Sequence, residues 1–76
     1  MVKIGSVFDP VKLSAECIKD NDFYSVWVIP NTTFRFIFCV LDKYDRYLVL
    51  QTFPCKSEAI YCFDWYSRNG GYFEKS

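Results

Sequence analysis

Hydrophobic residues occupy alternate positions within residues 23–29 and 32–41, and residues 47–53 form a further mainly hydrophobic run. Successive side chains of a β-strand point to opposite faces of a sheet, so a period of two predicts a strand in each of the first two segments. The third segment is expected to be their partner strand. The polar residues 42–46 separate the last two segments and predict a turn that joins them as an antiparallel hairpin. Pro54 has no backbone N–H to donate to a neighbouring strand, and it therefore ends the third strand.

Residues 10–19 show the spacing of a short amphipathic helix, with Leu13 and Cys17 four positions apart. Asp9 is a suitable N-cap for this helix, because its carboxylate can accept hydrogen bonds from the first exposed N–H groups. Proline at position 10 suits the first helical position, where its missing N–H has no partner to lose. Ahead of this helix, residues 2–8 predict a short first strand.

A second helix is predicted over residues 57–68, with Ser57 as its N-cap. Its hydrophobic positions follow the i, i+3, i+4, i+7 rule of a helix that packs one face on a core. These positions are Ala59, Cys62, Phe63 and Tyr66. Asn69-Gly70-Gly71 follows them and predicts a left-handed C-terminal stop.

In order, these elements predict one α+β domain over residues 1–76, a three- to four-stranded antiparallel sheet with two short helices packed on one face. Two short helices can cover one face of such a sheet, yet the opposite face is also rich in hydrophobic residues. Contiguous exposed apolar patches are rare on monomers and commonly mark partner surfaces. We therefore expect the second face to bind a partner or to form a homodimer through Trp27, Ile37, Cys39 and Leu41.

The charges are balanced and scattered, with nine Lys and Arg residues against nine Asp and Glu residues. A nucleic-acid-binding domain usually carries a basic patch, and none is visible in this chain. Aromatic residues exposed on a sheet can nevertheless stack on unpaired bases while arginines contact phosphates. Single-stranded nucleic-acid binding is therefore the alternative function, through Trp27, Arg35, Tyr44 and Tyr47.

Candidate catalytic groups are scarce in this sequence. The chain has no His and only three Gly, so it offers no imidazole base for a nucleophile and no glycine-rich phosphate loop. Its four Cys lack the close spacing of a zinc site and indicate reduced, buried thiols. The longest apolar run, residues 36–41, is too short to span a membrane, and nothing near Met1 has the pattern of a signal peptide. We expect no catalysis, no metal, no cofactor and a cytoplasmic location.

Tyr61 and Trp65 are spaced i, i+4 on the flank of the second predicted helix, beside its core positions. Interfaces between proteins favour Tyr, Trp and Arg, because each buries a large area and keeps a polar group. Arg68 extends the same flank by one turn. The sequence therefore predicts a partner-binding surface made of Tyr61, Trp65 and Arg68.

Residues 34–69 resemble the YegP-like family of small bacterial domains of unknown function. The resemblance consists of Phe34-Arg35-Phe36 at the start of a strand, an acidic turn, an aliphatic returning strand, Lys56-Ser57 before a helix and Arg68-Asn69 near its end. It implies an antiparallel sheet with one packed helix and tandem or paired domains, and it implies no catalytic residue.

The size and composition of the chain are also similar, at the level of class, to small inhibitors that viruses and mobile elements direct against host defence enzymes, anti-CRISPR proteins included. The sequence thus predicts a non-catalytic protein-binding module that acts by occluding a partner, such as a host defence nuclease complex.

Overall fold

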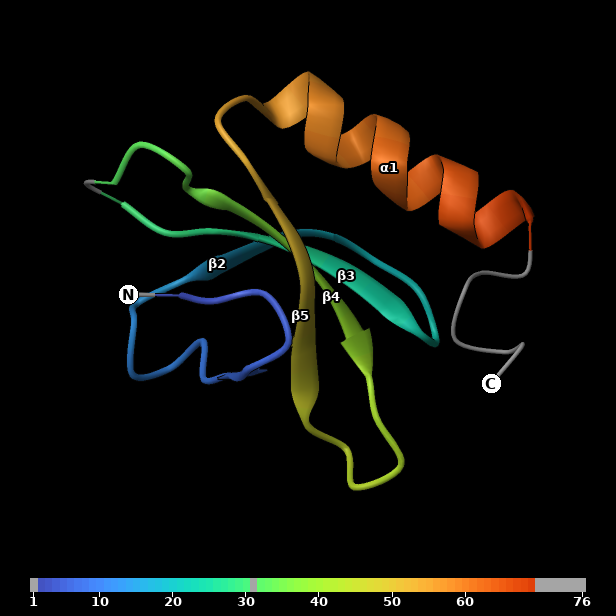
Figure 1. Ribbon diagram of the computed structural model, residues 1–76, viewed down its shortest axis with the longest axis horizontal. Helices are drawn as coiled ribbons and strands as arrows, with labels where there is room; N and C mark the ends of the chain where they lie inside the picture. Colours follow the sequence, from blue (N-terminus) through green and yellow to red (C-terminus); the bar gives the residue numbers. More distant parts are fainter. Residues whose placement is uncertain (1, 31, 70–76) are drawn as a thin grey trace.

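The computed structural model describes residues 2–30 and 32–69, which form a five-stranded antiparallel sheet and one helix (Figure 1). The strands stand in the order β1-β5-β4-β3-β2, so the three central strands are consecutive along the chain. The elements are β1 Val7–Phe8, β2 Glu16–Asp20, β3 Tyr24–Val28, β4 Phe36–Leu41, β5 Tyr47–Phe53 and α1 Lys56–Arg68. The predicted α+β class and antiparallel sheet are confirmed, with five strands and one helix where three or four strands and two helices are expected.

The three central strands lie where the hydrophobic segments of the sequence predict them. Val26 pairs with Phe38 between β3 and β4, and Val40 pairs with Leu48 between β4 and β5. A bulge in the β4–β5 ladder follows Phe38, so that Leu50 has no single partner on β4. The predicted strand 32–41 is shorter in the structure, because β4 begins only at Phe36.

The turn between β4 and β5 is held by Asp42. Its carboxylate accepts hydrogen bonds from the backbone N–H groups of Tyr44 at 2.8 Å and Arg46 at 2.9 Å. The Arg46 side chain adds an ion pair of 3.0 Å, and these donors lower the pKa of the Asp42 carboxyl. Asp45 takes a positive φ of 61°, a conformation that Asp tolerates better than most residues.

One hydrophobic core lies between the sheet and α1. Ala59 and Phe63 of the helix are buried against Val26, Phe38 and Val40 of the sheet. The helix begins at Lys56 with Cys55 as its N-cap, so the predicted N-cap Ser57 lies inside the first turn. At the other end the Asn69 N–H donates to Trp65 O at 3.1 Å, and the predicted stop at residues 70–71 lies outside the described residues.

The helix predicted over residues 10–19 is wrong. The Asp9 side chain does accept from the Val11 N–H at 3.2 Å, but it caps a turn that is not continued as a helix. Ser14 takes a positive φ of 56°, which interrupts a right-handed helix. The chain then enters β2, where Cys17 pairs with Trp27 on β3. Pairing with a neighbouring strand outweighs a helical periodicity that is too short to be stable alone.

The second face of the sheet is covered from within the chain, and the expectation of an uncovered face is therefore wrong. Residues 2–15 lie across this face, on the side away from α1 (Figure 1). Phe8, Val2 and Ala15 from this segment pack there. They cover Ile37, Cys39 and Val49, all of which are completely buried. The sheet thus lies between two hydrophobic cores, one under a helix and one under an irregular segment.

Candidate protein-binding groove

One flank of α1 is exposed to solvent and carries two aromatic side chains. Tyr61 is 67% exposed and Trp65 is 45% exposed, although both are large. The two residues are four positions apart, so they lie one above the other on the same face of the helix. Ala59 and Phe63 on the sheet side of α1 are buried. The structure therefore brings Tyr61 and Trp65 together on a surface that is separate from the core.

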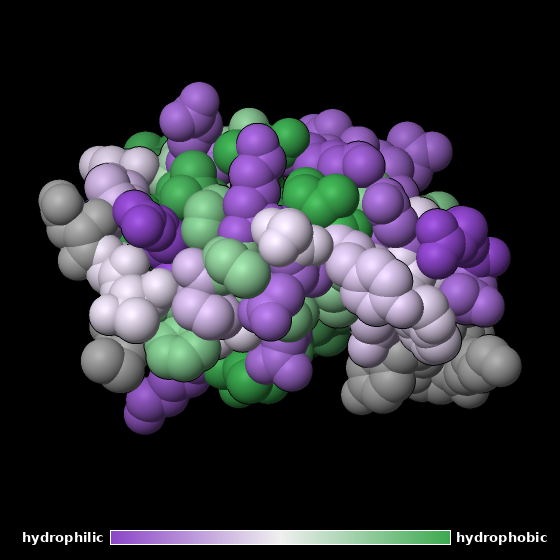
Figure 2. Space-filling view, turned by 90° about the horizontal axis from the view of Figure 1, so that it is seen from above, coloured by the Kyte–Doolittle hydropathy of each residue, from purple (hydrophilic) through white to green (hydrophobic). Residues whose placement is uncertain are grey.

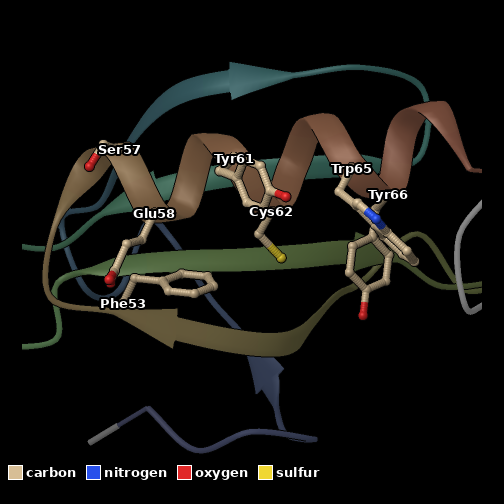
Figure 3. A pocket seen from close by; sticks show the side chains of 7 residues that line it. All are labelled: Phe53, Ser57, Glu58, Tyr61, Cys62, Trp65 and Tyr66. Atoms are coloured by element: carbon tan, nitrogen blue, oxygen red, sulfur yellow. The ribbon is translucent and has the colours of Figure 1, made fainter.

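An open groove of about 610 Å³ lies between this flank and the end of β5 (Figure 3). Phe53, the last residue of β5, forms the wall opposite the helix, and Tyr61 and Trp65 form the outer wall. Cys62 and Tyr66 point from α1 towards the sheet and line the inner part of the groove. The lining is thus mainly aromatic, with few polar groups, which is the usual composition of a binding site.

Aromatic contacts tie the groove to the core beneath it. The Trp65 ring lies 5.2 Å from the Tyr66 ring at 69°, an edge-to-face geometry that aromatic pairs prefer. Tyr66 in turn lies 5.1 Å from Phe38 and 5.7 Å from Tyr24. Because these two rings are buried in the sheet, the Trp65 side chain rests on a rigid base and loses little freedom when a partner covers it.

The opposite flank of α1 is held to the sheet by polar contacts. Lys19 Nζ on β2 lies 3.1 Å from Asp64 Oδ1 and 5.3 Å from the centre of the Phe63 ring. In the turn after β2, Asn21 Nδ2 donates to Ser67 Oγ at 2.8 Å. These contacts fix the side of the helix that faces β2, so the flank over β5 is left as the accessible one.

Opposite charges stand at the two ends of the exposed flank. Glu58 lines the groove in the first turn of α1, and Arg68 lies on the last turn. The helix dipole is positive at the N-terminus and negative at the C-terminus, so it stabilises the acidic side chain at the first turn and the basic side chain at the last turn. Ten residues separate them, which corresponds to about 15 Å along a helix. Glu58 therefore makes one end of the groove acidic, and Arg68 lies beyond the lining residues, three positions after Trp65 on the same helix.

Cys62 is the cysteine that lines the groove. Burial raises the pKa of the Cys62 thiol, so this sulfur stays protonated and is a poor nucleophile. Over residues 2–30 and 32–69 the structure contains no group of three His, Cys, Asp or Glu side chains that could hold a metal ion. What the groove offers is aromatic surface and a few hydrogen-bonding groups, which suit non-covalent binding.

The residues expected on a dimer face lie in the second core. Ile37 and Cys39 are completely buried, and burial raises the pKa of the Cys39 thiol to about 12. Trp27 is half-buried, with its ring 6.0 Å from Phe8, and its Nε1 donates to Ser25 Oγ at 2.8 Å. Leu41 is half-buried at the end of β4. The apolar surface predicted for homodimerisation is therefore occupied by the chain itself.

The residues of the nucleic-acid alternative are not brought together. Trp27 and Tyr47 do meet, at 5.1 Å, but they do so within the second core. Tyr44 is 65% exposed on the β4–β5 turn, beside Lys43 Nζ at 5.2 Å. Arg35 lies before the start of β4, at the opposite end of that strand. No continuous row of exposed stacking rings results among these four residues.

Two features of the groove are not anticipated from the sequence. Phe53 reads as the end of a strand, yet it provides the wall opposite α1. In the sequence, Glu58 is expected only to interact favourably with the N-terminal end of the helix dipole, yet it also lines the groove. The signal available in the sequence is Pro54-Cys55, a short connection that forces α1 to return along β5 and so places both residues at one end of the groove.

Figure 2 views the molecule from the side on which α1 lies, and hydrophobic side chains are separated there by hydrophilic ones. No extended apolar sheet is visible on this face, so an interface here depends on a few aromatic side chains. No described helix is long and apolar enough to cross a membrane.

Comparisons with known proteins bring no relative to this chain: no family model matches it, and no curated protein or solved structure does.

Proposed function

We propose that this protein is a non-catalytic binding module that occludes the surface of a partner protein through the groove beside α1. The observation that carries the proposal is the exposure of Tyr61 and Trp65 in one groove over a rigid aromatic base. A small domain gains little stability from large side chains left in solvent, whereas an interface gains much from them. That the partner belongs to a host defence nuclease complex stays a prediction from the sequence.

The direct test compares variants of equal exposure on two surfaces. Tyr61→Ala and Trp65→Ala alter the groove, and Tyr44→Ala is the matched control, because Tyr44 is 65% exposed and Tyr61 is 67% exposed. Each chain is immobilised, and proteins retained from a lysate of the producing cells are quantified by mass spectrometry. We expect one partner to be retained equally by wild type and Tyr44→Ala.

Its affinity for Trp65→Ala should fall by about 2 kcal/mol or more, which is the loss typical of a central interface residue. Circular dichroism shows whether each variant keeps its fold. Retention of the same proteins at equal levels by folded Tyr61→Ala and Trp65→Ala would contradict the proposal, and so would the absence of any protein that distinguishes wild type from these variants.

A further inference from the structure

The outer edge of β5 is paired along only half of its length. β1 pairs with Tyr47 and Leu48 and then ends. Two further backbone hydrogen bonds involve Val49. The Gly5 N–H donates to the Val49 carbonyl oxygen, and the Val49 N–H donates to the Ser6 carbonyl oxygen. Beyond Val49, no described strand pairs with residues 50–53 on this side, because β5 lies between β4 and β1 and β1 is only two residues long. Phe53, the last residue of this free half, lines the groove.

A backbone donor in this free half bonds to a neighbouring side chain. The Thr52 N–H donates to Gln51 Oε1 at 3.2 Å, in a contact between adjacent residues. An edge strand with open backbone groups is a template for pairing with another chain. A carbonyl from an incoming strand can replace the Gln51 amide oxygen as the acceptor, so this donor can be used without breaking the sheet.

The two edges of the sheet are protected differently. The edge strand β2 carries Glu16, Lys19 and Asp20, and a bulge interrupts its pairing with β3. Charges and bulges are the devices by which proteins block pairing at an edge. Residues 50–53 are Leu-Gln-Thr-Phe and contain no charge. The β2 edge is thus protected against pairing with another strand, whereas the second half of β5 lacks these features.

We propose that the groove binds an extended segment of the partner, which adds to the free half of β5 as a further strand. This inference rests on the proposed function and specifies the chemistry of the partner. An extended segment on a sheet edge gains affinity from backbone hydrogen bonds and specificity from pockets for alternate side chains. In this groove a bulky apolar side chain of the segment lies against Phe53, Tyr61 and Trp65.

Glu58 in the groove and Arg68 beyond it on the same helix set the direction and spacing of the segment. α1 returns along β5 in the opposite direction (Figure 3), so a segment antiparallel to β5 runs from Glu58 towards Arg68. A span of about 15 Å corresponds to four or five residues of extended chain at about 3.3 Å each. The segment therefore carries a basic residue near Glu58, an acidic residue four or five positions later near Arg68, and the apolar side chain between them.

The experiment begins with random ten-residue linear peptides, displayed on phage and selected on the full chain. The best peptide is then synthesised, and its Kd is measured by calorimetry for three variants. Thr52→Pro removes the edge donor, and proline is tolerated in an edge strand where its N–H faces outward. Thr52→Val keeps the donor and is the matched control. We expect Thr52→Pro to weaken binding at least tenfold and Thr52→Val to change it less than twofold.

Arg68→Glu tests the direction. It should weaken a peptide that has an acidic residue at its C-terminal end at least fivefold, and the same peptide with Lys at that position should bind this variant better than it binds the wild type. Equal binding of both peptides to Arg68→Glu would overturn the assigned direction.

A second measurement needs no variant and covers the case in which Thr52→Pro does not fold. Amide exchange of the wild type is followed by NMR with and without saturating peptide. Strand addition should slow exchange of the Thr52 N–H at least tenfold, and unchanged exchange at saturation would overturn it. If no peptide is selected, the proposal of strand addition by a partner segment is also overturned. A dimer in sedimentation equilibrium that Thr52→Pro abolishes would overturn it too, because the strand added to β5 would then come from a second copy of this chain.

The outcomes separate this inference from the proposed function. If Trp65→Ala loses the partner but Thr52→Pro, when folded, retains it, the binding role stands and strand addition fails. If the partner is retained regardless of Tyr61 and Trp65, the proposed function itself fails.

Discussion

The two faces of the sheet are covered in different ways, and only one covering leaves a surface for binding. α1 covers one face with Ala59 and Phe63 and exposes its other flank as an ordered row of side chains. Residues 2–15 cover the second face with Phe8 and a few aliphatic residues, and only two of these residues form a strand. A helix can bury one side and present another, because its side chains project all round the axis.

The segment over the second face does expose hydrophobic residues, namely Ile4, Val7, Val11 and Leu13. Single exposed aliphatic residues are normal on protein surfaces. In contrast to Tyr61 and Trp65, they belong to turns and a two-residue strand. The comparison therefore indicates that regular structure, more than exposed area, distinguishes the candidate binding surface.

The largest expected effect is the loss of the helix-side core in Phe38→Ala. Phe38 is completely buried and contacts Tyr24, Phe63 and Tyr66, so its removal should cost about 3–5 kcal/mol. A domain of this size has a stability of similar magnitude, so the variant should be largely unfolded. Urea denaturation followed by circular dichroism measures this loss. Phe34→Ala is the control, because Phe34 is 54% exposed and its removal should cost less than about 1 kcal/mol.

A slightly smaller loss should follow from Phe8→Ala, which removes the main side chain over the second face. Phe8 is 3% exposed and its ring lies 6.0 Å from Trp27. We expect a loss of about 3 kcal/mol and, in the fraction that remains folded, a red shift of Trp27 fluorescence in a Trp65→Phe background. Val11→Ala, at a side chain that is 87% exposed, should change neither the stability nor the Trp27 fluorescence. An unchanged stability of Phe8→Ala would mean that the second core contributes little to folding.

The burial of the Cys39 thiol in the second core makes the stability of the protein depend on pH in the alkaline range. Its pKa is raised from 9.0 to about 12 in the folded state by burial. The unfolded chain releases this proton above pH 9 and the folded chain does not, so the stabilising contribution is complete below pH 9 and falls by about 1.4 kcal/mol per pH unit up to about 12. Urea denaturation at several pH values should show a steeper decline for wild type than for Cys39→Ala. Equal slopes would show that the segment admits water to Cys39.

The smallest effect concerns the ion pair between Lys19 and Asp64, which holds the helix on the side away from the groove. Both side chains are about two-fifths exposed, at 41% and 42%, and exposed pairs contribute about 0.2–1 kcal/mol. A double-mutant cycle with Lys19→Met and Asp64→Asn should give a coupling energy in this range, reduced by added salt. A coupling energy near zero at low salt would leave Asn21 and Ser67 as the polar contact that fixes this flank.

Much of the fold could be predicted from local patterns. The strands β3 and β4 and the C-terminal helix follow from periods of two and of about 3.6. The hairpin turn at residues 42–46 and the strand β5 follow from a polar segment between two hydrophobic runs. In the candidate site, the exposure of Tyr61 and Trp65 follows from their position beside the core stripe of that helix. Phe53, Glu58 and the open edge of β5 could not be predicted in this role, because their proximity depends on how α1 returns along the sheet.

The sequence alone determines where hydrophobic positions alternate and where helical spacing begins and ends, since both depend on neighbours within a few residues. It also determines that no His is present. The tertiary structure alone decides that residues 16–20 are a strand, because the hydrogen-bond partners that stabilise them lie on β3. It also decides that residues 2–15 close the second face. Hydrophobic surface is buried by whichever segment can reach it, and a local pattern does not specify which segment that is.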